Sequence, residues 1–341
     1  MWLEGANTGG VVDIEIDSLD FGALTGRSCD LLWLRACFNG RVANLYCTAG
    51  GGCRGILYGA KDFNSGNIEF DSITLADAGV AIQLGQAWNN ANQNLLNQMT
   101  LTNFKCVRTA PTTGSAITVT LGGVMPQSVT SLLVAAGDAT KVAAAIAAGT
   151  PQWIVAADGV GSGDVISVTA ASGTTLTLAT PIPQALANGS ILGVGTHGVI
   201  VMTNSRGVVM TNPHFESTGF GTYCTTAQQV TLTGARLNTD SATVAQVGVY
   251  CTKGTQDVVV QQPLYSKAAT AATLLDISNL GTNARCQLIE PAGFSSGAGP
   301  KFFANAAALS GANEHRPLLA GLPLDFDFRV GHFFQSFKHV H

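Results

Sequence analysis

The chain has 341 residues, of which 46% are hydrophobic and 11% charged, and it contains 40 glycines. This composition favours a turn-rich β architecture over a helical one. The 17 basic and 21 acidic residues give a net charge of −4, which excludes a basic surface that would attract nucleic acid. No uninterrupted apolar run of about 18 residues occurs, so the sequence predicts no membrane insertion.

The N-terminal segment MWLEGANTGGVVDIEID lacks the basic segment and the apolar stretch of a secretory signal. We expect either that the protein is not exported by that route or that the sequence is a fragment. From Val12 to Asp17 apolar and polar residues alternate, which is typical of a strand with one buried face.

Short apolar segments then recur along the chain. Ile73 to Leu75 resembles Met99 to Leu101, and Val42 to Cys47 fits a further coil upstream. A repeated unit of this kind points to stacked coils rather than to a globular domain with one irregular core.

The composition changes between Arg108 and His197, where Cys, Arg, Glu and His are all absent. Strands are expected at 116–123, 164–183 and 190–195, and a short helix at 141–149. Removal of 109–196 brings Met99 and Val208 to the spacing of one coil. We therefore predict a small β-sandwich or barrel inserted into one turn, which serves either to bind sugar or as a spacer.

The repeat returns in the C-terminal part. Tyr223 to Thr225 recurs as Tyr250 to Thr252, and Val230 to Leu232 recurs as Val258 to Val260. A period of about 22 to 28 residues suits a parallel β-helix, in which inward residues stack on those of the next coil. The predicted fold is all-β: a right-handed, single-stranded parallel β-helix (solenoid) with a small inserted all-β domain.

Four parts of the chain are predicted. Coils of the β-helix occupy residues 1–108 and 197–295, and the inserted domain occupies 109–196. The segment 296–341 is expected to cap the solenoid or to make trimer contacts.

Eight cysteines are present, without a CxxC pair and without a histidine at zinc-finger spacing. The sequence therefore predicts no metal site and no cofactor. Most of the cysteines are expected to be buried thiols. A disulfide between Cys47 and Cys53, which flank a glycine turn, is the alternative.

Polar residues cluster after the second strand of successive coils. Alignment of the repeats places His214 over Arg236 and Glu216 over Asn238, with Asp240 following on the same coil. Phe215 and Leu237 alternate with them and are expected to point inward.

Sugar hydrolysis needs two carboxyl groups about 5 to 9.5 Å apart. Coil geometry places the backbones of Glu216 and Asp240 about 8 Å apart, within the range of inverting enzymes. Glu216 and Asp240 are thus the predicted acid and base. The predicted substrate contacts are His214, Arg236, Asn238, Lys267 and Trp88. The alternative is that the polar residues are solvated side chains of a coil face and that Trp88 packs in a core or a subunit contact.

Asp62, Glu69 and Asp71 form a second acidic patch near an early coil. Their spacing fits a turn as well as it fits a catalytic site.

The stacked VVM, VTL and VVV coils, the NSGNIEFDSITL pattern and the SGTTLTL phrase resemble the pectin-lyase-like superfamily, and within it bacteriophage tailspikes and tail fibres. The resemblance implies a homotrimer in the phage tail, made in the cytoplasm of the bacterial host, with other virion tail proteins as further partners. It also implies binding of bacterial surface polysaccharide, either capsule or lipopolysaccharide. Many members cleave that polymer as glycoside hydrolases or polysaccharide lyases.

The sequence departs from this family at two points. No N-terminal module for attachment to a virion is recognisable before the first coil, so we expect either a fragment or another mode of anchoring. The paired Asp-Asp, Gly-His-Gly and Arg-Ile-Lys motifs of polygalacturonases are absent, and only His197 followed by Gly198 occurs. Pectin hydrolysis by that route is therefore not expected.

Three functions remain open from the sequence. The first is a receptor-binding tailspike, with or without depolymerase activity. The second is a free-standing secreted polysaccharide lyase or hydrolase, which acts outside the cell. The third is a non-catalytic structural spacer of a virion.

Overall fold

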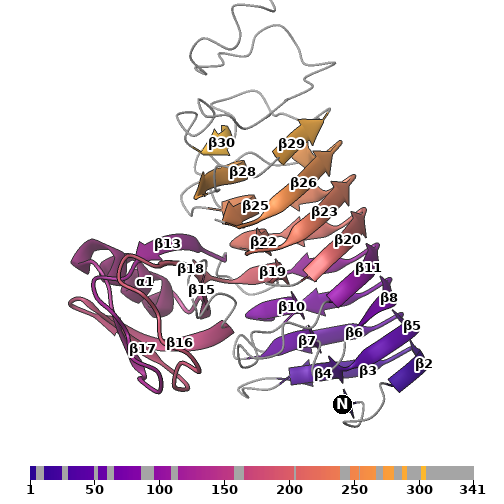
Figure 1. Ribbon diagram of the computed structural model, residues 1–341, viewed down its shortest axis with the longest axis horizontal. Coiled ribbons are helices and arrows are strands. Elements are labelled where there is room, and N and C mark those ends of the chain that lie inside the picture. Colours follow the sequence, from indigo (N-terminus) through magenta and orange to yellow (C-terminus); the bar gives the residue numbers. More distant parts are fainter. Residues whose placement is uncertain are drawn as a thin grey trace, which may run out of the picture.

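The computed structural model describes residues 1–4, 11–24, 30–49, 53–59, 65–85, 96–108, 114–156, 165–202, 205–238, 246–252, 254–265, 272–279, 286–289 and 301–304. Three parallel sheets run along one axis (Figure 1), and successive strands of the chain fall into them in turn. Each coil thus contributes one short strand to each side of a three-sided solenoid. The predicted all-β, parallel β-helix class is confirmed.

The strands divide among the three sheets as follows. The nine-stranded sheet holds β1 (Trp2–Glu4), β4 (Asp30–Arg35), β7 (Arg54–Gly59), β10 (Val80–Leu84), β19 (His197–Val201), β22 (Phe220–Cys224), β25 (Gln246–Thr252), β28 (Ala272–Asn279) and β30 (Lys301–Ala304). The eight-stranded sheet holds β2 (Val11–Asp17), β5 (Cys37–Ala43), β8 (Ser65–Asp71), β11 (Leu96–Thr102), β20 (Ser205–Thr211), β23 (Gln228–Thr233), β26 (Gln256–Gln261) and β29 (Cys286–Ile289). The seven-stranded sheet holds β3 (Asp20–Leu24), β6 (Tyr46–Ala49), β9 (Thr74–Ala76), β12 (Lys105–Val107), β21 (His214–Glu216), β24 (Arg236–Asn238) and β27 (Leu264–Tyr265).

The corner between the eight-stranded and seven-stranded sheets is made by one residue with positive φ. Its N–H still bonds to the next coil, as in Asn44 N to Asp71 O at 3.1 Å and Ser72 N to Thr102 O at 2.9 Å. Asn and Ser tolerate this conformation better than bulky residues do. The corner residues are Ser18, Asn44, Ser72, Asn103, Asn212, Gly234 and Gln262.

Apolar side chains of like position stack inside the solenoid. In the eight-stranded sheet Phe70, Leu101, Met210, Leu232 and Val260 form one such buried column. Each layer covers the one before it, at a strand spacing of about 4.8 Å. The column is part of a continuous core that extends from Ile14 to Leu288.

The predicted register is confirmed in the C-terminal coils, where Tyr223 pairs with Tyr250 and Val230 with Val258. The proposed match of Ile73 to Leu75 with Met99 to Leu101 is wrong. Met99 and Leu101 pair instead with Ile68 and Phe70 of β8. Ile68 to Phe70 and Ile73 to Leu75 both have a polar residue between two apolar ones. The sequence pattern alone therefore does not show which of these two strands pairs with Met99 to Leu101.

Seven of the cysteines lie in the described ranges, and all seven are buried thiols. Cys224 pairs with Cys251 on adjacent coils, as expected for a stacked core position. Burial raises the pKa of the Cys37 and Cys106 thiols to about 11. These thiols therefore act as small apolar groups at neutral pH. Cys29 lies outside the described residues.

The chain leaves the solenoid after β12 and returns at β19, and β10 pairs directly with β19. The pairing of Met99 with Val208 across this excursion confirms the predicted coil spacing. The residues between β12 and β19 therefore contribute no strand to the nine-stranded sheet. They project from one flank of the solenoid in Figure 1.

These residues form a six-stranded antiparallel sheet and one helix. The strand order is β13 (Ala116–Thr120), β18 (Ile191–Gly195), β15 (Gln152–Ala156), β16 (Val165–Ser172), β17 (Thr175–Leu178) and β14 (Ser131–Leu133). A bridge between Leu121 and Val134 joins the two edges, so the sheet closes on itself. It encloses a separate core. The boundaries of an inserted domain at 109–196 stay a prediction.

The helix α1 (Ala136–Ala147) begins earlier than the predicted 141–149. The preceding Ala-Gly-Asp sequence is typical of a turn, but Asp138 lies in the first helical turn. A carboxylate there stabilises the helix through its dipole. No helix in the described ranges is long and apolar enough to cross a membrane.

A third cluster of buried residues joins this barrel to the outer face of the nine-stranded sheet. His197 stacks on Phe220 with ring centroids 4.9 Å apart, and its Nε2 lies 3.2 Å from the Trp153 carbonyl oxygen. Complete burial lowers the pKa of His197 to about 3. The ring is therefore neutral and donates from Nε2, which gives it a packing role.

Gly193 of β18 tests how closely the barrel fits the solenoid. A Cβ at this position would lie 2.2 Å from Cε2 of the buried Tyr223 ring. We expect Gly193→Ala to lower the free energy of unfolding by about 1 to 3 kcal/mol through overpacking. Urea unfolding measures the change.

The control for Gly193→Ala is Gly137→Ala in α1, where nothing lies within 4 Å of the added Cβ. That substitution is expected to raise stability by up to about 1 kcal/mol, since alanine favours the helix. Equal stability of the two variants would contradict the close junction.

Candidate functional site

A polar ladder runs along the outer face of the seven-stranded sheet, over β12, β21 and β24. Lys105, His214 and Arg236 pair across the three strands and form one row. Glu216 pairs with Asn238 in a second row, two residues further along the strands. The structure thus confirms the predicted placement of His214 over Arg236 and of Glu216 over Asn238. We call these five residues the polar ladder.

The side chains between them point inward, as predicted. Cys106, Phe215 and Leu237 are 2%, 2% and 8% exposed and belong to the solenoid core. Strand geometry alternates side chains between the two faces, so the buried row fixes the direction of the polar ladder. Its position is therefore set by core packing rather than by contacts among its own members.

Contacts inside the polar ladder centre on His214. Asn238 Nδ2 lies 3.1 Å from His214 Nε2, and Glu216 Oε2 lies 3.8 Å from the same nitrogen. An amide N–H can only donate, so Nε2 accepts and the ring is neutral with its proton on Nδ1. The His214 and Glu216 side chains are 23% and 32% exposed, which leaves both accessible to a ligand.

Desolvation lowers the pKa of His214, and the charges of Lys105 and Arg236 lower it further, against the opposing effect of Glu216. Its neutral form is thus favoured at neutral pH. Because the unfolded chain takes up this proton at a higher pH than the folded chain, the histidine reduces stability as the pH falls below its ordinary value of 6.5.

NMR titration of the His214 ring tests this electrostatic arrangement. We expect a pKa below the ordinary 6.5. Lys105→Gln should raise the pKa by removing a nearby positive charge, and Glu216→Gln should lower it by removing a negative one. A wild-type pKa at or above the ordinary value, or shifts of the opposite sign, would contradict the described contacts.

Lys105 was not among the predicted site residues. It belongs to the polar ladder because Cys106 pairs with Phe215, and this register places Lys105 next to His214. Val107 on the other side of Cys106 is apolar, so the alternation of polar and apolar residues that marks β21 and β24 is incomplete here. The wrong match of Met99 to Leu101 also obscures the register of this coil.

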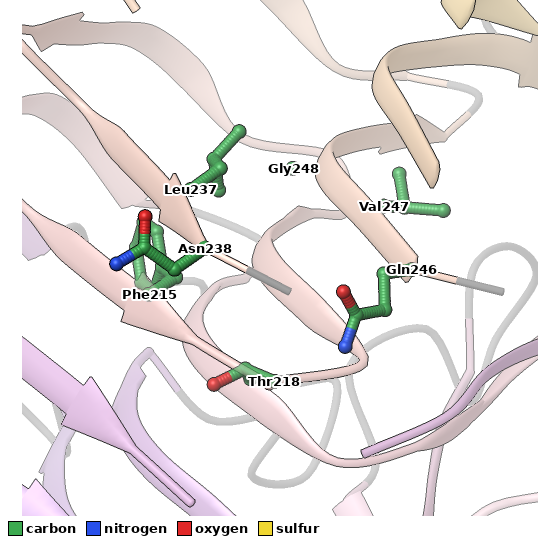
Figure 2. Close-up of a pocket in the computed structure, with 7 residues that line it drawn as sticks. All are labelled: Phe215, Thr218, Leu237, Asn238, Gln246, Val247 and Gly248. Atoms are coloured by element: carbon green, nitrogen blue, oxygen red, sulfur yellow. The ribbon is translucent and has the colours of Figure 1, made fainter. Parts of the chain in front are cut away.

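A recess lies beside the ladder, where β24 ends and β25 begins (Figure 2). It holds about 230 Å³, counted to its open mouth. Its polar lining comes from Thr218, Asn238 and Gln246. Thr218 and Gln246 are not among the residues predicted from the sequence, because only the stacking of coils brings them together.

Three predicted residues, Asp240, Lys267 and Trp88, lie outside the described residues. The predicted carboxyl pair therefore has one described member, Glu216. Within the part of the chain that the structure describes, no group of His, Cys, Asp and Glu side chains is arranged to hold a metal ion.

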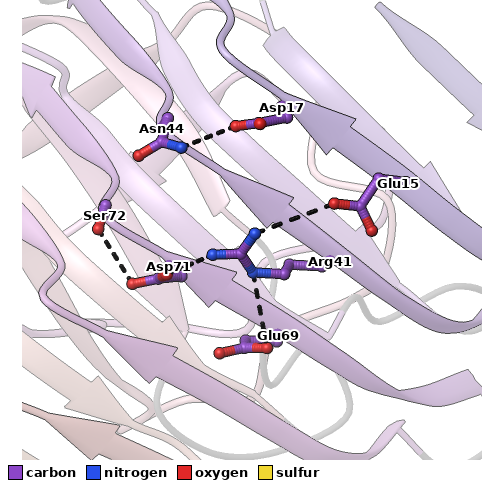
Figure 3. A network of polar contacts seen from close by, with 7 residues as sticks. All are labelled: Glu15, Asp17, Arg41, Asn44, Glu69, Asp71 and Ser72. Carbon is purple, nitrogen blue, oxygen red and sulfur yellow. Dashed lines mark hydrogen bonds and ion pairs between the residues drawn. The ribbon is translucent and has the colours of Figure 1, made fainter.

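The second acidic patch is an ion-pair network rather than a pair of free carboxyl groups (Figure 3). Arg41 lies 2.6 Å from Asp71, 3.8 Å from Glu69 and 3.9 Å from Glu15, on adjacent coils. The hydrogen bond from Arg41 lowers the pKa of Asp71. A carboxylate held ionised in this way is a poor general acid. Asp62 lies outside the described residues.

The described geometry defines a parallel β-helix with a polar ladder and a small recess on one flank. Neither protein-family models nor curated protein sequences give a match to the chain. Solved structures of bacteriophage tailspikes do match. One is the Gp54 tailspike of Acinetobacter baumannii bacteriophage AP22, in complex with A. baumannii capsular saccharide. It is 11% identical, with a TM-score of 0.20, over 77% of this chain and 53% of that one.

Another is the tailspike protein gp49 from Pseudomonas phage LKA1. It is 11% identical, with a TM-score of 0.17, over 81% of this chain and 46% of that one. The chain thus spans about half the length of these two proteins. At such TM-scores the likeness carries no argument, so the fold assignment rests on the strand pairing itself.

Proposed function

We propose that the chain is a receptor-binding protein of the phage tailspike kind that recognises bacterial surface polysaccharide, either capsule or lipopolysaccharide. The observation that carries the proposal is the polar ladder on a rigid solenoid flank. In this proposal the chain belongs to the pectin-lyase-like β-helices, assembles as a homotrimer and resides in the virion tail with other tail proteins.

The ladder suits a polymeric ligand because its groups repeat along the solenoid axis. Adjacent strands place them about 4.8 Å apart, so neighbouring rungs can contact one extended chain. Lys105, Arg236 and the Nδ1 proton of His214 donate hydrogen bonds, while Glu216 and the Asn238 carbonyl accept them. Sugar hydroxyls both donate and accept, so such a mixed row matches them.

The rigidity of the support favours binding. The ladder side chains stand on strands whose inward neighbours are buried in the continuous core. Little backbone ordering is then needed when a ligand binds, which reduces the entropic cost of association.

Substitution of Arg236 tests the proposal. Arg236 is exposed on β24, and loss of a charged hydrogen bond should weaken polysaccharide binding about tenfold or more. Binding to capsule and lipopolysaccharide extracted from candidate host bacteria is measured by surface plasmon resonance. The expected ligand binds the wild type and binds Arg236→Ala more weakly.

Arg206→Ala is the matched control, because Arg206 is also exposed but lies on β20 of the adjacent sheet. Its binding should equal that of the wild type. Equal loss in both arginine variants would assign the effect to overall charge. Failure of the wild type to bind any such polymer would favour the spacer function instead.

Cleavage of the polymer is the second candidate function, and the partly exposed Glu216 beside neutral His214 favours it. We propose Glu216 and Asp240 as the acid and base of a hydrolase, with Asn238, Lys267 and Trp88 among the substrate contacts. A lyase would instead use a base next to a cationic group such as Lys105.

The cleavage proposal predicts that a Glu216→Gln, Asp240→Asn double variant loses at least about a hundredfold in rate, as expected on removal of general acid and base catalysis. New reducing ends report hydrolysis, and absorbance of an unsaturated product reports elimination. Undiminished release by the double variant would remove this pair from the mechanism. If the wild type binds the polymer but releases no cleavage product, the chain is a non-catalytic receptor-binding protein.

A further inference from the structure

Gln246, the first residue of β25, carries an unused hydrogen-bond donor. The residue is 6% exposed, and its buried Nε2 has no hydrogen-bond partner. A buried donor without an acceptor costs free energy, which a bound acceptor would restore. The side chain lines the recess beside the polar ladder (Figure 2).

The same recess offers two acceptors. Asn238 uses its Nδ2 on His214, which leaves Oδ1 available. The Thr218 hydroxyl lies 3.4 Å from the Glu216 carbonyl oxygen and 3.5 Å from Cys106 Sγ. When it donates to either atom, the oxygen lone pairs remain free to accept. A fitting ligand group therefore has one acceptor and one donor.

The remaining lining is apolar and uncharged. It consists of Phe215, Leu237, Val247 and Gly248. The absence of a charged side chain among the lining residues disfavours a carboxylate or phosphate, which would lose hydration without a counter-ion. The recess is small and open to solvent at its mouth, so a single sugar substituent fits better than a complete oligosaccharide.

We propose that this recess binds the acetamido group of an N-acetylated amino sugar in the recognised polysaccharide. Its carbonyl oxygen accepts from Gln246 Nε2, and its N–H donates to Asn238 Oδ1 or Thr218 Oγ1. The methyl group packs against Leu237 and Val247. This inference rests on the proposed function, because the recess joins the polar ladder through Asn238.

The ligand side of the proposal is tested on the wild-type chain by saturation-transfer NMR. The ligands are the methyl glycosides of N-acetylglucosamine, N-acetylgalactosamine, glucose and galactose. At least one acetylated sugar should receive saturation, most strongly at its acetyl methyl protons, and the plain sugars should receive less. Equal transfer to acetylated and plain sugars would overturn the assignment.

The protein side is tested with Gln246→Met, which keeps the size of the side chain but removes the donor. Affinity for the acetylated glycoside should fall about tenfold, the effect of one hydrogen bond. Stability should be retained, since no buried donor is left unpaired. Gln228→Met, at an exposed position of β23, is the matched control and should bind as the wild type does.

The outcomes separate this inference from the proposed function. Polysaccharide binding that survives in Gln246→Met, with no preference for acetylated sugars, would remove the acetamido site and leave the receptor function intact. Absence of binding to every polysaccharide and every glycoside would refute both.

Discussion

Each coil of this protein buries its apolar side chains only because the next coil covers them. That stacking, at a strand spacing of about 4.8 Å, restricts every other feature of the molecule. Corners have to turn without breaking the ladder, which accounts for the series of residues with positive φ such as Asn44 and Asn212. The segment between β12 and β19 has to return the chain to the next coil of the solenoid. The direct pairing of β10 with β19 shows that it does.

The candidate site follows from the same constraint. When Phe215 and Leu237 are buried on successive coils, the residues on either side are forced outward and into register. The polar ladder is therefore built on the core and needs little support from its own contacts. The recess arises where β24 ends and β25 begins, beside that ladder. A rigid row of mixed donors and acceptors next to a small uncharged recess is well suited to an extended, substituted sugar polymer.

Much of this arrangement could be predicted from the sequence, because inward positions of a solenoid repeat in both spacing and residue type. The pairing of Tyr223 with Tyr250 and of His214 with Arg236 are examples. The sequence alignment of the early coils is wrong, because Ile68 to Phe70 and Ile73 to Leu75 share the same order of apolar and polar residues. Gln246 could not be predicted, because its isolation as a buried donor depends on packing between coils that no local pattern records.

The most direct test of the stacking is the distance between β11 and β20, which belong to the coils before and after the segment between β12 and β19. Thr100 of β11 and Val209 of β20 are paired and exposed, so nitroxide spin labels at these positions should show strong dipolar broadening, as expected for neighbouring strands about 4.8 Å apart. Labels at Thr100 and Val259, three strands apart in the same sheet, should show a clearly longer distance. Loss of broadening in the first pair, or equal distances in both, would contradict the stacked solenoid.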